Sequence, residues 1–209
     1  FQFDRLYRHL YNEDFYIKAY SKIYKNKGSA TKGINEETAD GFGEEKIQAI
    51  IESLKDESYQ PKPVRRIHIP KKNGDTRPLG IPTFTDRLVQ EVCRMVLEAI
   101  YEPNFSNHSH GFRPKRSCHT ALVEIKKTFT GVNWFIEGDI KGFFDNVDHS
   151  KLIKQIWTLG IRDKELIYVI KRIFDPDLGS ITIKNGVRIP YNLMIVLNSI
   201  SYGLVSIFI

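Results

Sequence analysis

Apolar residues recur every three or four positions along most of the chain, the spacing of helices with one buried face. The first such region, 4–24, predicts one or two amphipathic helices, and a polar loop containing glycine follows at 25–38. Further helices are expected to begin at Thr85, Ser117, Asp148 and Asp163, of which the last three are suitable caps. The expected buried stripes are Ile47, Ile50, Ile51 and Leu54; Leu88, Val92, Met95, Val96 and Ala99; Ala121, Leu122 and Ile125; Leu152, Ile153 and Ile156; and Leu166, Ile167, Ile170 and Ile173.

Three short runs have the character of strands instead. VRRIHI and RPLGI, at 64–69 and 77–81, flank an Asn73-Gly74 pair, which strongly indicates a β-hairpin because both positions favour positive φ. WFIEGDI, at 134–140, predicts a third strand in which Glu137 and Asp139 share one face. Helices, hairpin, helices, strand and helices in this order predict an α+β fold without regular βαβ alternation.

Charge makes the hairpin a candidate binding element. The 209 residues include 31 Lys and Arg against 25 Asp and Glu, for a sequence pI near 9.2, so nucleic acid or another anionic surface is a plausible partner. The hairpin segment carries one acid, Asp75, against six cations: Lys62, Arg65, Arg66, Lys71, Lys72 and Arg77. Such a hairpin is a candidate phosphate clamp; the alternative is a solvated basic edge that prevents strand-to-strand aggregation.

Other residues exclude or weaken competing functions. Cys93 and Cys118 lack metal-ligand spacing and indicate reduced, buried thiols in a cytoplasmic protein. Three histidines at 108, 110 and 119 have no carboxylate or thiol in register and do not predict a metal site. The charged first residues indicate a trimmed N-terminus and no signal peptide. The uncharged tail, 189–209, is long enough to span a bilayer, but its Asn, Ser, Pro and Gly residues favour a buried element or the loss of an original continuation.

Asp139 is the candidate for chemistry. A carboxylate at a strand end, beside a free carbonyl, is half a site for Mg²⁺, which takes one or two carboxylates, waters and phosphates. The alternative is an ordinary acidic residue, since one Asp alone cannot hold the two metals of phosphoryl transfer. With the cationic hairpin, the pattern indicates a bound nucleoside triphosphate or nucleic-acid backbone.

Three blocks then resemble consecutive motifs of group II intron-encoded reverse transcriptases, also called maturases. They are RPLGIPTFTDRLVQE, SHGFRPKRSCHTAL and WFIEGDIKGFFDNVDH, and the resemblance runs from about residue 4 to about residue 175. It implies the right-hand polymerase fold, with fingers and an incomplete palm. The implied divisions are an N-terminal extension and template-lid loop at 1–35, fingers at 36–130, a partial palm at 131–183 and a divergent apolar tail at 184–209.

The resemblance also implies roles for individual residues. Asp139 matches the first catalytic aspartate and binds Mg²⁺ together with the Ile140 carbonyl, while Phe144 packs under the sugar and favours dNTPs. Lys71 and Arg77 match residues that grip the triphosphate, and Arg113 a contact to the template or templating base pair. The loop 26–35 matches one that lies over the template. The residues implied in binding intron RNA, for which a merely solvated surface is the alternative, are Lys18, Lys22, Lys25, Lys27, Arg65 and Arg66.

The function implied is that of an RNA-directed DNA polymerase acting with group II intron RNA, an RNA template, a DNA primer and dNTPs. The family continues with a TPQGG-like block and a Tyr-Ala-Asp-Asp hairpin, and neither occurs in this sequence. We therefore expect the 209-residue chain alone not to extend a primer. The alternative is a non-catalytic module that binds intron RNA and assists splicing. The apolar tail and an open sheet edge suggest a homodimer.

Overall fold

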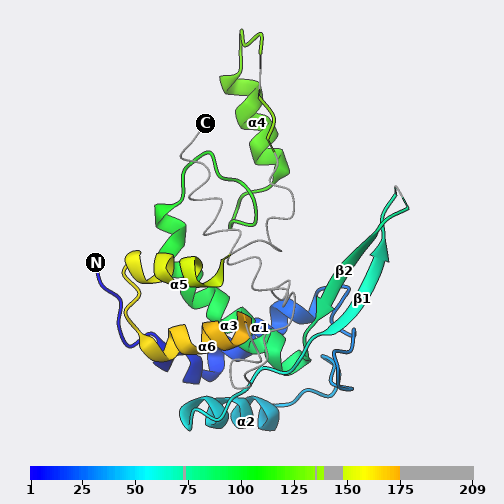
Figure 1. Cartoon of the computed structure of the whole chain (residues 1–209), viewed down its shortest axis with the longest axis vertical. Helices are drawn as coiled ribbons and strands as arrows, with labels where there is room; N and C mark the ends of the chain where they lie inside the picture. Colours follow the sequence, from blue (N-terminus) through cyan, green and yellow to red (C-terminus); the bar gives the residue numbers. More distant parts are fainter. Residues whose placement is uncertain (73, 135, 139–147, 175–209) are drawn as a thin grey trace.

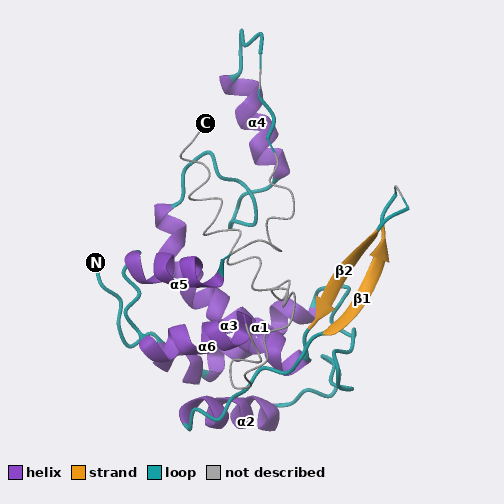
Figure 2. Ribbon diagram, viewed as in Figure 1, coloured by secondary structure: helices purple, strands orange, loops and turns teal. Residues whose placement is uncertain are grey.

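The computed structural model describes residues 1–72, 74–134, 136–138 and 148–174. Within that part, helices form the body and one two-stranded hairpin projects from it (Figures 1 and 2). The α+β class predicted from the sequence is therefore confirmed. The elements are η1 (Tyr7–Tyr11), α1 (Glu13–Tyr24), α2 (Glu44–Lys55), β1 (Arg65–Pro70), β2 (Thr76–Ile81), α3 (Phe84–Tyr101), η2 (Glu102–Asn104), α4 (Cys118–Thr128), α5 (His149–Thr158) and α6 (Lys164–Phe174).

Helix α3 is the centre of the body. Thirteen of its eighteen residues are buried, so neighbours enclose it on more than the single face that periodicity predicts. It begins at Phe84 and not at Thr85, because the Thr83 hydroxyl accepts the Asp86 N–H at 3.1 Å and caps the helix. The expected stripe was also wrong at one end, since Ala99 is exposed.

The N-terminal region folds as two helices over α3. Asn12 separates η1 from α1, and its side chain caps α1 by accepting the Asp14 N–H at 2.9 Å. Helix α2 buries the four apolar residues of its predicted stripe. The Tyr7 hydroxyl donates to the Leu54 carbonyl at 2.7 Å, which joins η1 to the end of α2.

Two aspartates cap the last described helices, as the sequence predicted. Asp148 accepts the N–H groups of Ser150 and Lys151 at the start of α5, at 2.9 and 3.1 Å. Asp163 accepts the Leu166 N–H at 3.0 Å with one oxygen and the Tyr7 N–H at 2.7 Å with the other. This second bond fixes the N-terminal region to α6.

The predicted hairpin is confirmed. Strands β1 and β2 pair in antiparallel register from Arg65 opposite Ile81 to Pro70 opposite Thr76. Asn73 lies outside the described residues, but Gly74 has φ +88°, a conformation that L side chains rarely adopt. The Lys71 N–H donates to the Asp75 carbonyl at 2.7 Å and closes the connection.

Two expectations fail in the segment from α4 onward. Of the strand predicted at 134–140, residues 134 and 136–138 form no strand, and residues 135, 139 and 140 lie outside the described part. The two strands of that part, β1 and β2, pair with each other, so the segment has no partner there. Helix α4 buries none of its residues, and Leu122 and Ile125 are exposed, because it extends away from the body (Figure 1). Periodicity identifies an amphipathic face but cannot tell whether another element covers it. Cys118 is likewise exposed, whereas Cys93 is buried as expected.

No helix found among the described residues has the length and apolar character needed to cross a bilayer. The tail, 175–209, lies outside the described part.

Candidate nucleic-acid interface

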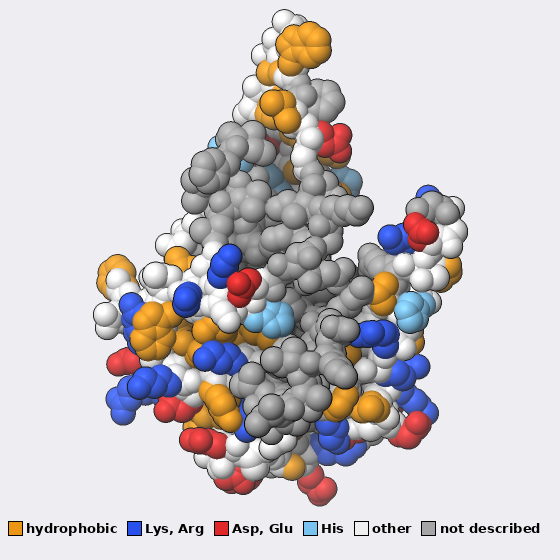
Figure 3. Space-filling view, in the orientation of Figure 1, with side chains coloured by type: hydrophobic (Ala, Val, Ile, Leu, Met, Phe, Trp, Pro, Cys, Tyr) orange, Lys and Arg blue, Asp and Glu red, His pale blue; other side chains and the backbone are white. Residues whose placement is uncertain are grey.

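The hairpin presents its cations to solvent. Lys62, Arg65, Arg66, Lys71 and Lys72 are all exposed, and Figure 3 shows Lys and Arg side chains along the hairpin and around its base. Of Arg77, the structure places the backbone in β2 opposite Ile69, and its side chain is outside the described part. A solvated arm with clustered positive charge and little apolar burial suits attraction to a phosphate backbone.

A buried carboxylate anchors the base of this arm. Asp86, in the first turn of α3, accepts hydrogen bonds from the Tyr59 hydroxyl at 2.8 Å, the Thr83 hydroxyl at 2.6 Å and the Lys62 N–H at 3.2 Å. Burial raises the pKa of Asp86, and these hydrogen bonds oppose the rise. The segments that enter and leave the hairpin are thereby fixed to α3.

The loop 26–35 lies against the same base. The Arg87 guanidinium donates from Nε to the Pro82 carbonyl at 3.2 Å, from Nη1 to the Gly28 carbonyl at 2.9 Å and from Nη2 to the Thr31 carbonyl. Arg65 adds a bond from Nε to the Lys32 carbonyl at 3.0 Å. The structure therefore brings together the predicted hairpin and the predicted template loop.

Glycine is required at one point of that contact. A Cβ on Gly33 would lie 2.8 Å from the Pro82 carbonyl oxygen and equally close to the Thr83 backbone. Atoms at that separation overlap. The atoms that the Cβ would meet belong to the backbone of Pro82 and Thr83, which cannot move aside as a flexible side chain could. The sequence placed Gly33 in a polar loop but gave no sign of this close approach.

The lysines of α1 and its C-terminal end differ in their surroundings. Lys25 is exposed directly before the loop 26–35, and Lys27 is exposed within it. Lys18 is exposed with its Nζ 5.9 Å from the centre of the Phe15 ring. Lys22 instead pairs with the buried carboxylate of Glu91 at 2.9 Å, which favours an internal role for that side chain.

Arg113 lies away from the hairpin, in the loop that joins η2 to α4. Its Nε and Nη2 bind the Glu102 carboxylate at 2.9–3.2 Å. Its Nη1 donates to the carbonyls of Ser106 and Ser109 at 2.6 and 2.9 Å. All three nitrogens therefore have acceptors inside the protein, and the expected contact with template stays a prediction.

A carboxylate that the sequence analysis missed lies between two histidines. Glu124 of α4 bonds His108 Nδ1 with one oxygen and His110 Nε2, at 2.7 Å, with the other. The two histidines lie in a loop, 16 and 14 positions before Glu124 on the helix. That spacing matches no sequence motif, so the contact becomes visible only in the folded chain. In the described ranges, no group of three or more His, Cys, Asp or Glu residues is arranged to hold a metal ion.

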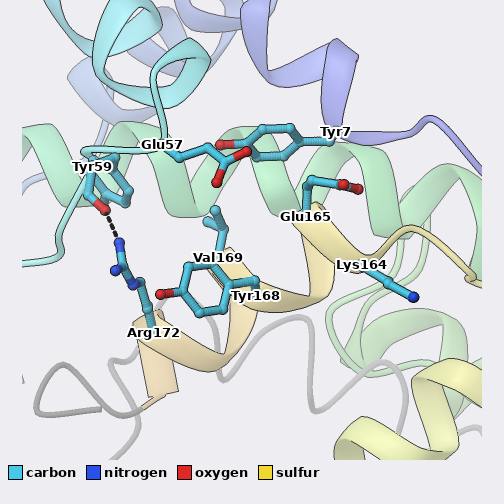
Figure 4. Close-up of a pocket in the computed structure, with 8 residues that line it drawn as sticks. All are labelled: Tyr7, Glu57, Tyr59, Lys164, Glu165, Tyr168, Val169 and Arg172. Atoms are coloured by element: carbon cyan, nitrogen blue, oxygen red, sulfur yellow. Dashed lines mark hydrogen bonds between the residues drawn. The ribbon is translucent and has the colours of Figure 1, made fainter. Parts of the chain in front are cut away.

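A separate cavity of about 370 Å³ opens between η1, the turn after α2, and α6 (Figure 4). In Figure 4, Glu57 and Tyr7 lie on one side of it and Arg172 on another. The Arg172 Nη1 donates to the Tyr59 carbonyl at 2.8 Å, and its guanidinium lies 4.4 Å from the Tyr168 ring centre. The lining mixes both signs of charge, unlike the cationic hairpin. Its residues are Tyr7, Glu57, Tyr59, Lys164, Glu165, Tyr168, Val169 and Arg172.

The residues predicted to bear the chemistry belong to the motif WFIEGDIKGFFDNVDH. Asp139, Ile140 and Phe144 lie outside the described residues. Their roles as catalytic aspartate, Mg²⁺ ligands and sugar contact remain predictions.

Comparison with known proteins identifies relatives of the chain. A family model described as reverse transcriptase (RNA-dependent DNA polymerase) matches residues 69–194, which extends past residue 175, where the sequence resemblance was expected to stop. Group II intron-encoded protein LtrA of Lactococcus lactis subsp. cremoris is 60% identical over 169 residues, covering 80% of this chain and 28% of that protein.

Two eukaryotic relatives extend this result. An uncharacterized 91 kDa protein in the cob intron of Schizosaccharomyces pombe is 48% identical over 163 residues, covering 78% of this chain and 20% of that protein. Nuclear intron maturase 1, mitochondrial, of Arabidopsis thaliana is 39% identical over 99 residues, covering 44% and 14%. The chain spans less than a third of the length of each of these relatives.

Proposed function

The chain belongs to the reverse transcriptase (RNA-dependent DNA polymerase) family, among the proteins encoded by group II introns, and we propose that it forms the nucleic-acid-binding fingers and the first part of the palm of such an enzyme. The observation that carries this proposal is the exposed cationic hairpin, held at its base by Asp86 beside the loop 26–35. The proposed divisions are an N-terminal extension and template-lid loop at 1–35, fingers at 36–130, a partial palm at 131–183 and an apolar tail at 184–209, of which residues 184–194 still match the family model.

The proposed ligand of the hairpin is phosphate. Lys71 sits where β1 ends, and Arg77 lies in β2, so both belong to the distal half of the arm. Lysine offers a compact positive charge and arginine a planar fork that can bind phosphate with two hydrogen bonds. This pairing supports a grip on the triphosphate of an incoming dNTP in the whole protein.

The proposed chemistry belongs to residues after α4. Asp139 and the Ile140 carbonyl would hold Mg²⁺, which would neutralise developing charge on the transferred phosphoryl group. Phe144 would exclude a 2′-hydroxyl and favour dNTPs. Support for these assignments comes from the motif WFIEGDIKGFFDNVDH and from family membership.

The proposed partner is structured RNA, in particular that of a group II intron. The relative LtrA is named as group II intron-encoded, and the Arabidopsis relative is named an intron maturase. Exposed Lys18, Lys25, Lys27, Arg65 and Arg66 would contact its phosphates. RNA template and DNA primer are proposed substrates of the whole protein.

Salt-dependent binding of a structured intron RNA tests this proposal. The chain should bind with an affinity that falls steeply between about 50 and 200 mM salt, as release of counterions requires. Replacing Lys25 and Lys27, two of the proposed RNA contacts, with alanine should lower the slope of log K against log salt by about 2, one for each lost phosphate contact.

The matched control replaces Lys151 and Lys154, two exposed lysines of α5, with alanine. Both double variants lose the same charge, so an unspecific effect of net charge would weaken them equally. Equal slopes for the two variants, or binding by the unmodified chain that does not respond to salt, would contradict the proposed interface.

A further inference from the structure

Arg87 is a buried cation whose acceptors are backbone carbonyls. The residue is 6% exposed, and its three side-chain hydrogen bonds reach carbonyl oxygens of Pro82, Gly28 and Thr31. Burial lowers the pKa of Arg87, and the positive charge of Arg65 nearby lowers it further. A buried charge needs several good acceptors to offset the cost of losing water, so this arrangement depends on the loop 26–35 staying in place.

The three carbonyls belong to two segments that are far apart in sequence. Gly28 and Thr31 lie in the loop, whereas Pro82 lies between β2 and α3. A single planar guanidinium with five N–H donors can bond all three at once; a lysine ammonium is a compact charge with a different reach. Arg87 therefore joins the loop to the base of the hairpin directly.

An independent observation supports the same contact between the loop 26–35 and the hairpin base. Gly33 approaches the backbone of Pro82 and Thr83 so closely that a Cβ would overlap it. The Thr85 hydroxyl also donates to the Glu37 carboxylate at 3.0 Å, just beyond the loop. The loop is therefore held to α3 and the hairpin base at its beginning, middle and end.

We propose that Arg87 is a positioning residue that fixes the loop 26–35 against the hairpin base, so that Lys25 and Lys27 and the hairpin cations present one continuous face to a nucleic-acid backbone. This inference rests on the proposed function, because it names a residue that acts on that interface through the loop. Arg87 itself is enclosed and makes no contact with nucleic acid. It acts only by fixing where the loop lysines lie.

Arg87→Lys tests the structural half of this inference by amide hydrogen exchange. The substitution keeps the charge but cannot satisfy the three carbonyls. The Ser29 and Thr31 N–H groups, which donate to the carbonyls of Asn26 and Gly28 inside the loop, should exchange about tenfold faster, as expected for one lost hydrogen bond to a charged donor.

The matched control is Arg172→Lys. Arg172 also donates to a carbonyl distant in sequence, Tyr59, but it lies on α6 beside the separate cavity. The Arg172→Lys variant should leave amide hydrogen exchange in the loop 26–35 unchanged. If Arg87→Lys fails to fold by circular dichroism, Gly33→Ala replaces it, since the added Cβ pushes the loop away without altering the arginine.

A double-mutant cycle with Lys27→Ala tests the functional half, with a fragment of structured intron RNA as the probe. Lys27→Ala should weaken RNA binding by the unmodified chain but have little further effect in Arg87→Lys, because a released loop no longer holds that lysine on the interface. In Arg172→Lys, Lys27→Ala should keep its full effect.

The outcomes separate the two proposals. Unchanged loop exchange in Arg87→Lys, or an equal effect of Lys27→Ala in both backgrounds, overturns the positioning role while leaving the RNA-binding function standing. No salt-dependent RNA binding by the unmodified chain overturns the proposed function and the functional half of this inference with it. The exchange experiment then decides the structural half by itself.

Discussion

Replacing Arg113 with methionine should destabilise the protein while leaving its RNA interface intact. The side chain is 6% exposed, and its guanidinium holds the loop after η2 through Glu102, Ser106 and Ser109. Methionine keeps the length of the side chain and removes the five donors. The loop therefore loses its internal cation, and its carbonyls and the carboxylate lose their partner.

The magnitude follows from those contacts. Two carbonyls that lose a charged donor cost about 1–3 kcal/mol each, less whatever surface water restores. The Glu102 side chain is 30% exposed, so its ion pair is screened and adds only about 0.5–1 kcal/mol. Together these costs should lower the free energy of unfolding by about 2.5–7 kcal/mol, with values toward the lower end where water reaches the freed carbonyls; for a chain of this size each 1 kcal/mol lowers the Tm by roughly 2–4 °C.

Urea unfolding followed by circular dichroism measures this change, and RNA binding is measured on the folded variant. Arg116→Met is the matched control, because Arg116 lies in the same loop. Within the described part of the chain, its guanidinium makes one hydrogen bond, from Nη1 to the Asn107 carbonyl at 2.8 Å. The Arg116→Met substitution should cost less than about 1 kcal/mol. An Arg113→Met variant with unchanged stability and weakened RNA binding would refute the internal role and favour a direct contact with template.

Three further predictions follow from the core. Phe84→Ala should cost about 3–5 kcal/mol of unfolding free energy by urea titration, because the ring is fully buried against Phe42; a cost below about 1 kcal/mol would contradict that packing. Burial raises the pKa of Asp86, so the native state holds its proton more tightly than the unfolded chain does. The stability that comes from this protonated carboxyl is complete below the ordinary Asp pKa and is lost as the pH rises through the native pKa. Asp86→Asn should remove this fall in unfolding free energy with rising pH. Parallel pH profiles of stability for the two proteins would refute the raised pKa. Burial also raises the pKa of Cys93 to about 12, so a thiol reagent at neutral pH should label Cys118 in the native protein and both thiols in urea.

Much of the framework could be predicted because its determinants are local. Asp148 and Asp163 cap helices through N–H groups two or three residues ahead, and Asn73-Gly74 marks a connection only a few residues long. The stripe of α2 needs one neighbouring surface, and the body of the protein supplies it. Helix caps and turns involve residues that are close together in the chain, so the sequence contains everything needed to predict them.

The failures in the segment from α4 onward share one cause, which is that they depend on a distant partner. Leu122 and Ile125 form a good apolar stripe on α4, yet burial requires another element to cover it. The segment 134–138 has the composition of a strand, yet a strand needs a neighbour with which to pair. Glu124 meets two histidines only because α4 returns past the loop that precedes it.

The basic residues show why an interface is harder to predict than a fold. Arg113 was expected to contact template and Arg87 drew no prediction from the sequence, yet both are buried and donate to carbonyl oxygens of the backbone. A carbonyl is present at every residue, so an arginine that binds one leaves no complementary residue type for a sequence pattern to find. Arginines that build the surface and lysines that face the ligand can then be separated only by the fold. In this protein the division is physical: the guanidinium forks of Arg87 and Arg113 fix two loops from within, and the loop lysines and the distal hairpin remain open to phosphate.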